Sequence, residues 1–242
     1  MQIRKLFEIL RLLSWGGRPS AWSLVWTELK RRCYSDELSV GFQLDLTRTS
    51  EGTAPEGSLA IRELSSSDVP LLLDFRRRGL DAVELRAILM RHLLVEARLP
   101  TCYVGIDVEK RPCCMCWLAR AEDNDRYRTY FGEGYQPLRP GEVLCEEIYT
   151  HPDHRGRRLM KHLTRAVLEI AATQDGARRA LAFIRADNRQ SLAGASVTGW
   201  EPFVYRQVSW RLFRRRRRFE SVFCFGTDRV GVPQAQPRPA RV

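Results

Sequence analysis

Hydrophobic residues recur every three or four positions in several stretches of the chain, a spacing that predicts amphipathic helices. The first such stretch covers residues 3–13, and Gly16-Gly17 would end it. A second helix is expected from about Ser20 to Arg32, with Ser20 as its cap. The remaining predicted helices cover residues 65–79, capped by Ser67 or Asp68 and closed by Gly79, and residues 81–100, 157–176 and 188–199.

Alternating apolar and polar residues predict strands between these helices. The segments are 39–50, 59–64, 142–150, 177–187 and 200–217, together with a hairpin over 101–121 that turns at about Lys110 to Pro112. Strands interleaved with helices predict an α/β or α+β fold, with one sheet and helices on both of its faces.

Linker composition divides the chain into three parts. The segment SEGTAPEGS, residues 50–58, reads as a linker. We therefore expect an N-terminal helical extension and linker over 1–57, a main domain over 58–219 and a partly disordered tail over 220–242. Residues 122–141 are polar and aromatic, and their length suggests a functional loop.

Positive charge dominates the surface chemistry, because the formal net charge is +11 with 29% charged residues. Such a chain attracts anions, among them nucleic acid, anionic lipid, an acidic carrier protein or a phosphorylated cofactor. Five arginines at 214–218 could grip a polyanion, but such a run is more often a strand edge with alternating outward charge. Nucleic acid is the least favoured of these partners; an acidic carrier protein or an anionic membrane surface remains open.

The seven cysteines do not form the two C-x-x-C pairs of a typical zinc site, so the sequence predicts no metal site. Three of them crowd into PCCMCW, which fits a buried strand, and a reducing cytoplasm is the expected location. Residues 3–13 could pack on the main domain or lie on an anionic membrane, peripheral to its inner face.

The segment EEIYTHPDHRGRRLMKHL, residues 146–163, joins a strand to a helix. Such a junction points free backbone N–H groups toward one place at the positive end of the helix dipole, and it can bind phosphate. Gly156 permits close backbone approach, and His154 with the arginines at 155, 157 and 158 adds positive charge.

This junction resembles the signature of the GNAT superfamily of acyl-CoA-dependent acyltransferases. Arg155 and Gly156 match its Arg-Gly opening, and Leu159 matches its apolar position. Arg158 stands where the central Gly is expected, and Met160 stands where Gly or Ala is expected. Two further stretches, 59–75 and 186–200, resemble the first strand and helix and the second signature of that family. The resemblance implies a mostly antiparallel central sheet over about two-thirds of the chain.

The resemblance also implies a site. Acetyl-CoA or another acyl-CoA would be the co-substrate, with no metal. Strand carboxylates would act as catalytic base, Glu146 first and Glu147 second, and strand alternation would place Glu146 on the face of Ile148 and Thr150. The implied cofactor-binding residues are Ile148, Tyr149, Thr150, Arg155, Gly156, Arg157, Arg158, Leu159, Met160, Asn188 and Ser191.

One expected group is missing, because the position of the family's general acid, seven residues after Asn188, is Ala195. Ser196, Tyr205 or a tyrosine at 127, 130 or 135 could replace it. The resemblance implies transfer of an acetyl or longer acyl group to an amine of a small molecule, sugar or peptide. The alternative is a non-catalytic module that binds acyl-CoA, a partner or a membrane, and a homodimer is left open.

Overall fold

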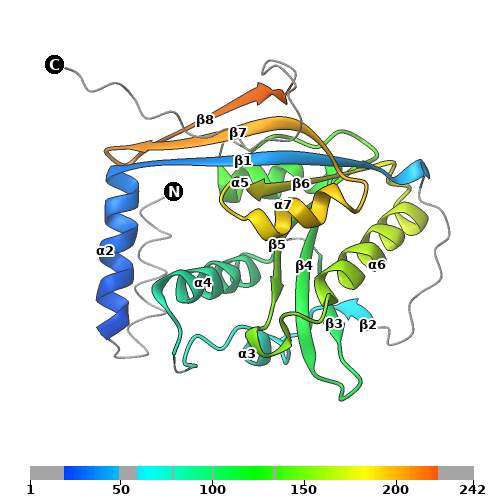
Figure 1. Ribbon diagram of the computed structural model, residues 1–242, viewed down its shortest axis with the longest axis horizontal. Coiled ribbons are helices and arrows are strands. Elements are labelled where there is room, and N and C mark those ends of the chain that lie inside the picture. Colours follow the sequence, from blue (N-terminus) through cyan, green and yellow to red (C-terminus); the bar gives the residue numbers. More distant parts are fainter. Residues whose placement is uncertain (1–18, 49–58, 78, 100, 133–134, 223–242) are drawn as a thin grey trace.

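The protein forms one eight-stranded sheet with helices on both faces, as Figure 1 shows. The computed structural model describes residues 19–48, 59–77, 79–99, 101–132 and 135–222. The strands are β1 (Tyr34–Asp45), β2 (Ala60–Glu63), β3 (Cys102–Ile106), β4 (Pro112–Arg120), β5 (Glu142–Thr150), β6 (Arg179–Arg185), β7 (Glu201–Arg211) and β8 (Arg214–Ser221). The helices are α2 (Pro19–Cys33), α3 (Val69–Leu72), α4 (Ala82–Glu96), α5 (Asn124–Phe131), α6 (Leu159–Gln174) and α7 (Arg189–Ser196).

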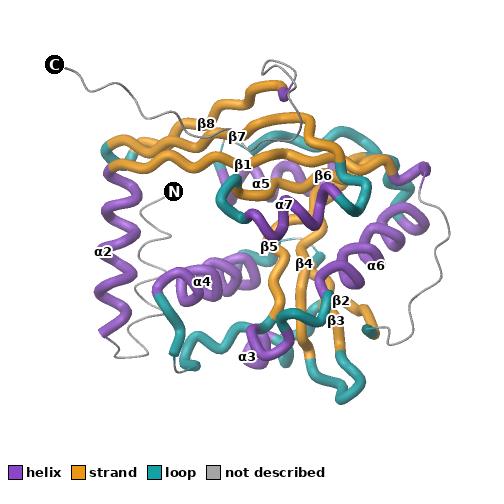
Figure 2. The backbone as a smooth tube through the Cα atoms, viewed as in Figure 1, coloured by secondary structure: helices purple, strands orange, loops and turns teal. Residues whose placement is uncertain are grey.

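The strand order is β2-β3-β4-β5-β6-β1-β7-β8, and the one parallel pair among these neighbours is β5 with β6. The predicted mixed, mostly antiparallel sheet is therefore confirmed. Figure 2 shows β1, β7 and β8 running across one end of the molecule, while β4 and β5 run in a different direction, away from that end. This twist sets the geometry of the site described below.

Strand β1 lies between β6 and β7, although it comes first in the chain. Its residues pair with β6 from Ser39 to Asp45 and with β7 from Tyr34 to Gln43. The sequence assigned these residues to an extension before a boundary at residue 58. Within the described sheet, β1 is the strand that joins β7 and β8 to the others, so a boundary at residue 58 would leave out a strand of this sheet.

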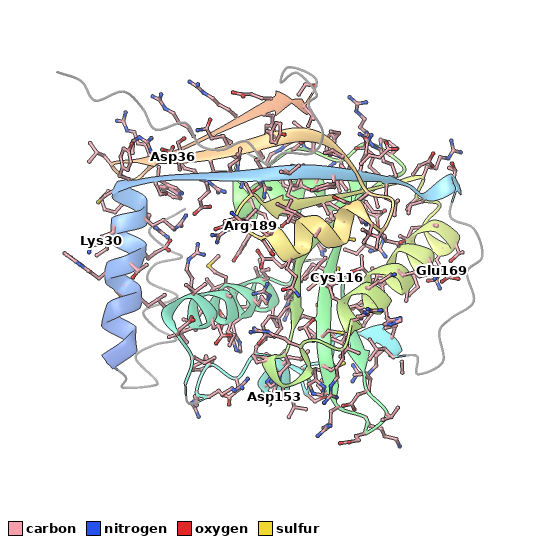
Figure 3. The ribbon with its side chains drawn as sticks, in the orientation of Figure 1. Lys30, Asp36, Cys116, Asp153, Glu169 and Arg189 are labelled. Carbon is pink, nitrogen blue, oxygen red and sulfur yellow. The ribbon has the colours of Figure 1, made fainter. Side chains whose placement is uncertain are left out.

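Two layers of helices cover the sheet. On one face, α6 buries Leu163, Val167 and Ala171 against Cys116 and Leu118 of β4; Figure 3 labels Cys116 at this place. We call this the α6 face; α7 covers its other half through Ala195, which packs against Val40 and Phe42.

The opposite face, here the α4 face, is covered by α2, α3, α4 and α5. The apolar stripe of α4 is buried throughout, and its residues are Leu85, Ile88, Leu89, Leu93 and Leu94. Ile88 packs with Met115 and Trp117 of β4, while Leu24 of α2 packs with Leu85 and its neighbours. The N-cap Asp81 accepts a hydrogen bond from the N–H of Glu84 at 2.7 Å, which starts α4 one residue after the predicted position.

Two predicted elements differ from the structure. Helix α3 has a single turn instead of spanning 65–79, because the Asp68 carboxylate binds Arg62 (2.6 Å) and the N–H of Ser65 (2.8 Å) and caps no helix. The predicted loop 122–141 contains α5, and Tyr127 of α5 is buried against Ala119 and Leu144. The sequence did not predict this helix, because most of its residues are polar and only one of its faces contacts the core.

Helix α2 begins at Pro19, so Ser20 lies in its first turn and not at its cap. The predictions for residues 3–13, for the linker over 50–58 and for the tail beyond residue 222 lie outside the described residues. Within the described part of the chain, no helix has the length and apolar character required to cross a membrane.

Candidate functional site

Strands β5 and β6 separate partway along their length. Their parallel ladder runs from Glu142–Arg179 to Cys145–Ala182, whereas β6 continues along β1 as far as Arg185. Beyond Cys145 the β5 edge that faced β6 has no strand beside it in the described sheet. Unpaired main-chain groups at such a split can pair with amide groups of a ligand.

A β-bulge interrupts β5 at the split. Met115 of β4 is opposite Tyr149, while Trp117 is opposite Glu146, so Glu147 and Ile148 share one position of the partner strand. Glu147 has a φ of 51°, in the left-handed region that side chains other than glycine rarely adopt. Backbone strain of this kind is concentrated at functional sites.

The bulge reverses one sequence prediction. Strand alternation placed Glu146 on the face of Ile148 and Thr150. The extra residue instead puts Glu146 on the α4 face, opposite Trp117, while Ile148 packs into the cluster under α6. Glu146 thus shares its face with Tyr149, which packs beside Met115 and Trp117.

Arg91 of α4 holds the bulge in place. Its guanidinium donates to the carbonyl oxygens of Glu147 (3.2 Å) and Ile148 (3.3 Å), pairs with the Glu147 carboxylate (3.2 Å) and lies 4.9 Å from the Tyr149 ring centroid. Arg91 is only 8% exposed, so these contacts are shielded from water. The Ile148 carbonyl is therefore already engaged, and Glu147 serves the local backbone through its ion pair.

Sequence reasoning missed Arg91, although a signal was present. Arg91 follows Ile88 by three residues and precedes Leu94 by three, so it stands on the apolar stripe of α4. A charge on a buried helix face needs a partner. Its partners are main-chain carbonyls, which sequence cannot identify.

Glu146 lies in a small pocket of about 220 Å³, counted with its open mouth. The lining residues are Tyr135, Gln136, Leu144, Glu146, Phe183, Arg206, Arg217 and Phe219. Burial raises the pKa of Glu146, an effect that Arg206, 3.7 Å from its Oε1, opposes and that Glu147 reinforces. A carboxyl group with a raised pKa, beside a pocket, is suited to take a proton from a reacting group.

Two tyrosines stand beside this carboxyl group. Tyr127 and Tyr135 stack with ring centroids 5.2 Å apart, and burial together with the charge of Glu146 raises the pKa of both phenols. The Tyr135 hydroxyl is buried and has no hydrogen-bond partner among the described residues. It lines the pocket, so it can bind a ligand atom there.

The other proposed acid groups lie elsewhere. Tyr205 packs under α7 on the opposite face of the sheet, and Ser196 donates to the Leu192 carbonyl at 3.1 Å. Ala195, at the family's tyrosine position, is buried in the same cluster. Asn188 caps α7 by accepting from the N–H of Ser191 at 3.1 Å, so both residues have a structural task.

The turn before α6 exposes main-chain donors. The N–H of Lys161 donates to the Arg158 carbonyl at 3.1 Å, and no backbone hydrogen bond is donated by residues 156–160 within the described chain. Gly156 has a φ of 80° and Arg158 a φ of 57°, so both adopt left-handed conformations. The open space around Gly156 means that its conformation, more than close approach, calls for glycine there. We call residues 155–160 the α6 turn.

Side chains of the α6 turn contribute unequally. Arg155 pairs with Glu84 at 2.9 Å, whereas Arg157 and Arg158 are exposed. Leu159 packs toward the α6 core, and Met160 is 38% exposed. His154 is buried 3.9 Å from the Asp107 carboxylate. Asp153, labelled in Figure 3, lies in the turn just before these residues, and its carboxylate forms an ion pair with Arg77 at 2.9 Å.

The arginine run of β8 alternates, as the strand-edge interpretation predicts. Arg214, Arg216 and Arg218 are exposed, while Arg215 and Arg217 are half-buried on the α4 face. Sequence reasoning did not place either of these two near Glu146.

Comparison with known proteins finds a family match over part of the chain. Residues 89–194 match the model of the family described as Acetyltransferase (GNAT) family. This segment starts within α4 and ends within α7, so it contains β5 and the α6 turn but neither β7 nor β8. No curated protein matches the sequence.

One of the similar solved structures supports the fold. A GCN5-related glucosamine N-acetyltransferase region of a fungal multi-domain GH3 β-N-acetylglucosaminidase superposes with a TM-score of 0.52 at 12% identity, over 80% of this chain and 23% of that one. A tandem GNAT protein from the clavulanic acid biosynthesis pathway gives 0.48 at 15% identity, over 79% and 59%. This chain spans 59% of the length of the tandem protein, 56% of a Drosophila protein and 65% of a Staphylococcus epidermidis protein. At such identities the likeness extends to the fold alone.

Proposed function

We propose that this chain transfers an acyl group from acyl-CoA to an amine, because residues 89–194 match the model of the GNAT acetyltransferase family. The observation that carries the proposal is the split of β5 from β6, with the half-buried Glu146 on one side of it and the open N–H groups of the α6 turn at its end. Acyl-CoA is a substrate here, and its diphosphate is the group that these N–H donors suit.

The α6 turn would hold the diphosphate mainly through its backbone. Five successive residues, 156–160, keep N–H groups available at the positive end of a 16-residue helix. Arg157 adds an exposed cation, while Arg155 is committed to Glu84. The pantetheine arm would then follow the free edge of β5 toward Glu146.

Glu146 would act as general base. As the amine nitrogen attacks the thioester carbonyl, a C–N bond forms, the C–S bond breaks and the amine loses a proton, which Glu146 accepts. The leaving thiolate needs no acid, because a thiol with a pKa of about 8.5 is already a good leaving group. Tyr135, whose pKa is raised, would keep its proton and serve as a hydrogen-bond donor to the reacting groups.

The test is release of free thiol from acetyl-CoA in the presence of a panel of amines. Removal of a general base lowers the rate about 10²- to 10⁴-fold, so thiol release by Glu146→Gln should be slower than that of the wild type by this factor. Glu147→Gln is the matched control from the same strand and should retain most of the activity. An equal loss in both variants would refute the assignment of the base to Glu146.

The competing function is a binding module without turnover, which the buried Ala195 favours because it leaves no tyrosine at the family's acid position. The same assay separates the two functions. Saturable binding of CoA with no thiol release for any amine would establish the module and exclude the enzyme.

A further inference from the structure

We infer that the acceptor carries an anionic group, a carboxylate or a phosphate, which Arg206, Arg215 and Arg217 bind on the α4 face beside Glu146. This inference rests on the proposed function, since it names the class of acceptor that the same site takes. The three arginines, which we call the arginine row, come from β7 and β8, outside the segment matched by the family model.

Strand register brings the row together. Val208 of β7 is opposite Arg217, Trp210 is opposite Arg215, and Arg206 is opposite Phe219. Arg217 is therefore a diagonal neighbour of Arg206, at roughly 7–8 Å along the sheet surface. Arg215 is a further two residues, about 7 Å, along β8. The row leads away from Glu146 in steps that a small molecule can span.

Two members of the row, Arg206 and Arg215, have little negative charge beside them among the described residues. Arg206 lies 3.7 Å from Glu146, and the carboxylate that acts on Arg215 is Glu37, which already pairs with Arg31 at 3.0 Å. The Nε atoms of Arg206 and Arg215 are buried and donate no hydrogen bond to any described residue. Buried donors of this kind cost free energy until an acceptor reaches them.

Repulsion between the positive charges of the row also favours the binding of an anion. Burial, with the charges of Arg215 and Arg206, lowers the pKa of Arg217 to about 9. Burial, with the charges of Arg206 and Arg31, lowers the pKa of Arg215 to about 10. An arginine stays charged in almost any environment, so a bound anion would relieve this repulsion.

Aromatic rings shape the site around the charges. The Arg206 guanidinium lies 4.1 Å from the Phe183 ring centroid, and Phe219 lies edge-on to Phe183 at 6.3 Å. These rings and Gln136 line the pocket that contains Glu146 and Arg217. An acceptor would thus place its ammonium group at Glu146 and its anionic group at the row, with its chain against the rings.

The experiment measures anion binding to the full-length protein saturated with coenzyme A, so that the α6 turn is already filled. Inorganic phosphate and acetate are titrated separately by calorimetry, which distinguishes a phosphate site from a carboxylate site. We expect saturable binding of at least one anion, weakened at least tenfold in the Arg215→Met, Arg217→Met double variant. Arg216→Met, from the same strand but the opposite face, should change the dissociation constant less than twofold.

Circular dichroism and thermal melting of each variant establish that it folds. Equal weakening by Arg216→Met would show that general surface charge binds the anion and would overturn the inference. Absence of saturable binding of both anions to the folded wild-type protein would overturn it as well.

A second arm uses turnover with matched amines: phosphoethanolamine against ethanolamine, and β-alanine against β-alanine amide. The charged member should have the higher kcat/KM, and the double variant should lose that preference. Anion binding that depends on the row, without thiol release for any amine, would support the anion site and refute the enzyme. Thiol release that is indifferent to the acceptor's charge and to the row would support the enzyme and refute the anion site.

Discussion

The α6 turn and the arginine row are both positive, but they are built in opposite ways. The α6 turn is one continuous segment whose backbone N–H groups are open and whose arginines are exposed or paired elsewhere. The arginine row is assembled from two strands, uses side chains and is half-buried. A helix end binds phosphate through fixed donors of modest charge, whereas buried guanidiniums give a strong field that water screens little.

Both regions depend on β5, which lies between them, so releasing its bulge should give the largest effect. Arg91→Met removes the donor to the Glu147 and Ile148 carbonyls, and hydrogen bonds to charged groups contribute about 2 kcal/mol. We expect urea unfolding of the Met variant to show a free energy of unfolding lower by about that amount, and we expect its kcat to be lower as well. Arg91→Lys should recover part of both, and an unchanged kcat in a folded Met variant would show that the bulge does not serve the reaction.

Gly156→Val separates backbone from side-chain binding at the α6 turn. A β-branched residue at a φ of 80° is strained by about 1–3 kcal/mol, so the turn should rearrange and bind CoA roughly tenfold more weakly. Calorimetric titration with CoA measures this. Arg157→Met, which removes an exposed cation, should have the smaller effect; the reverse order would show that charge, and not the backbone, holds the diphosphate.

The carboxyl group between the two regions should give a pH signature. The pKa of Glu146 is raised above its ordinary value of 4.5, so the folded protein keeps a proton that the unfolded chain releases. Stability from this group is therefore lost as pH rises from about 4.5 through the folded pKa. Glu146→Gln escapes that loss.

Thermal melts across this pH range should show the melting temperature of Glu146→Gln gaining on that of the wild type as pH rises. Acyl transfer by the wild type should increase over the same range, because the base must be ionised. Glu147→Gln, which removes a charge that reinforces the raised pKa of Glu146, should weaken the wild-type trend without abolishing it. A pH-independent difference between Glu146→Gln and the wild type would contradict the raised pKa.

The smallest effect concerns two adjacent arginines of the α6 turn. Arg158 has a φ of 57°, where residues other than glycine are strained by roughly 1–2 kcal/mol, so Arg158→Gly should stabilise the protein by about 0.5–1 kcal/mol after the entropy of glycine is counted. Arg157→Gly, where φ is not positive, should destabilise it by a similar amount. Chemical denaturation measures both, and a shift of the same sign in the two variants would refute the explanation.

The sequence anticipated what local pattern controls. Helix α4 and its buried stripe, β5, α6 and the alternation of β8 were predictable because each is set by periodicity within one segment. The junction at Gly156 was visible for the same reason, since its conformation follows from neighbouring residues. The sequence noted that Arg158 stands where the family motif expects glycine, and the structure shows that its backbone adopts a left-handed conformation there.

What tertiary structure decided is everything that joins distant segments. No local pattern indicated that β1 enters the sheet between β6 and β7, that a bulge moves Glu146 to the α4 face, or that Arg91 binds the bulge. The arginine row arises only when β7 and β8 pair with each other beside β1. Periodicity indicates which face of a segment is buried, but not which segment covers that face. The sequence alone therefore predicted a phosphate-binding turn and a carboxylate. The pairing of strands determined which residues surround them.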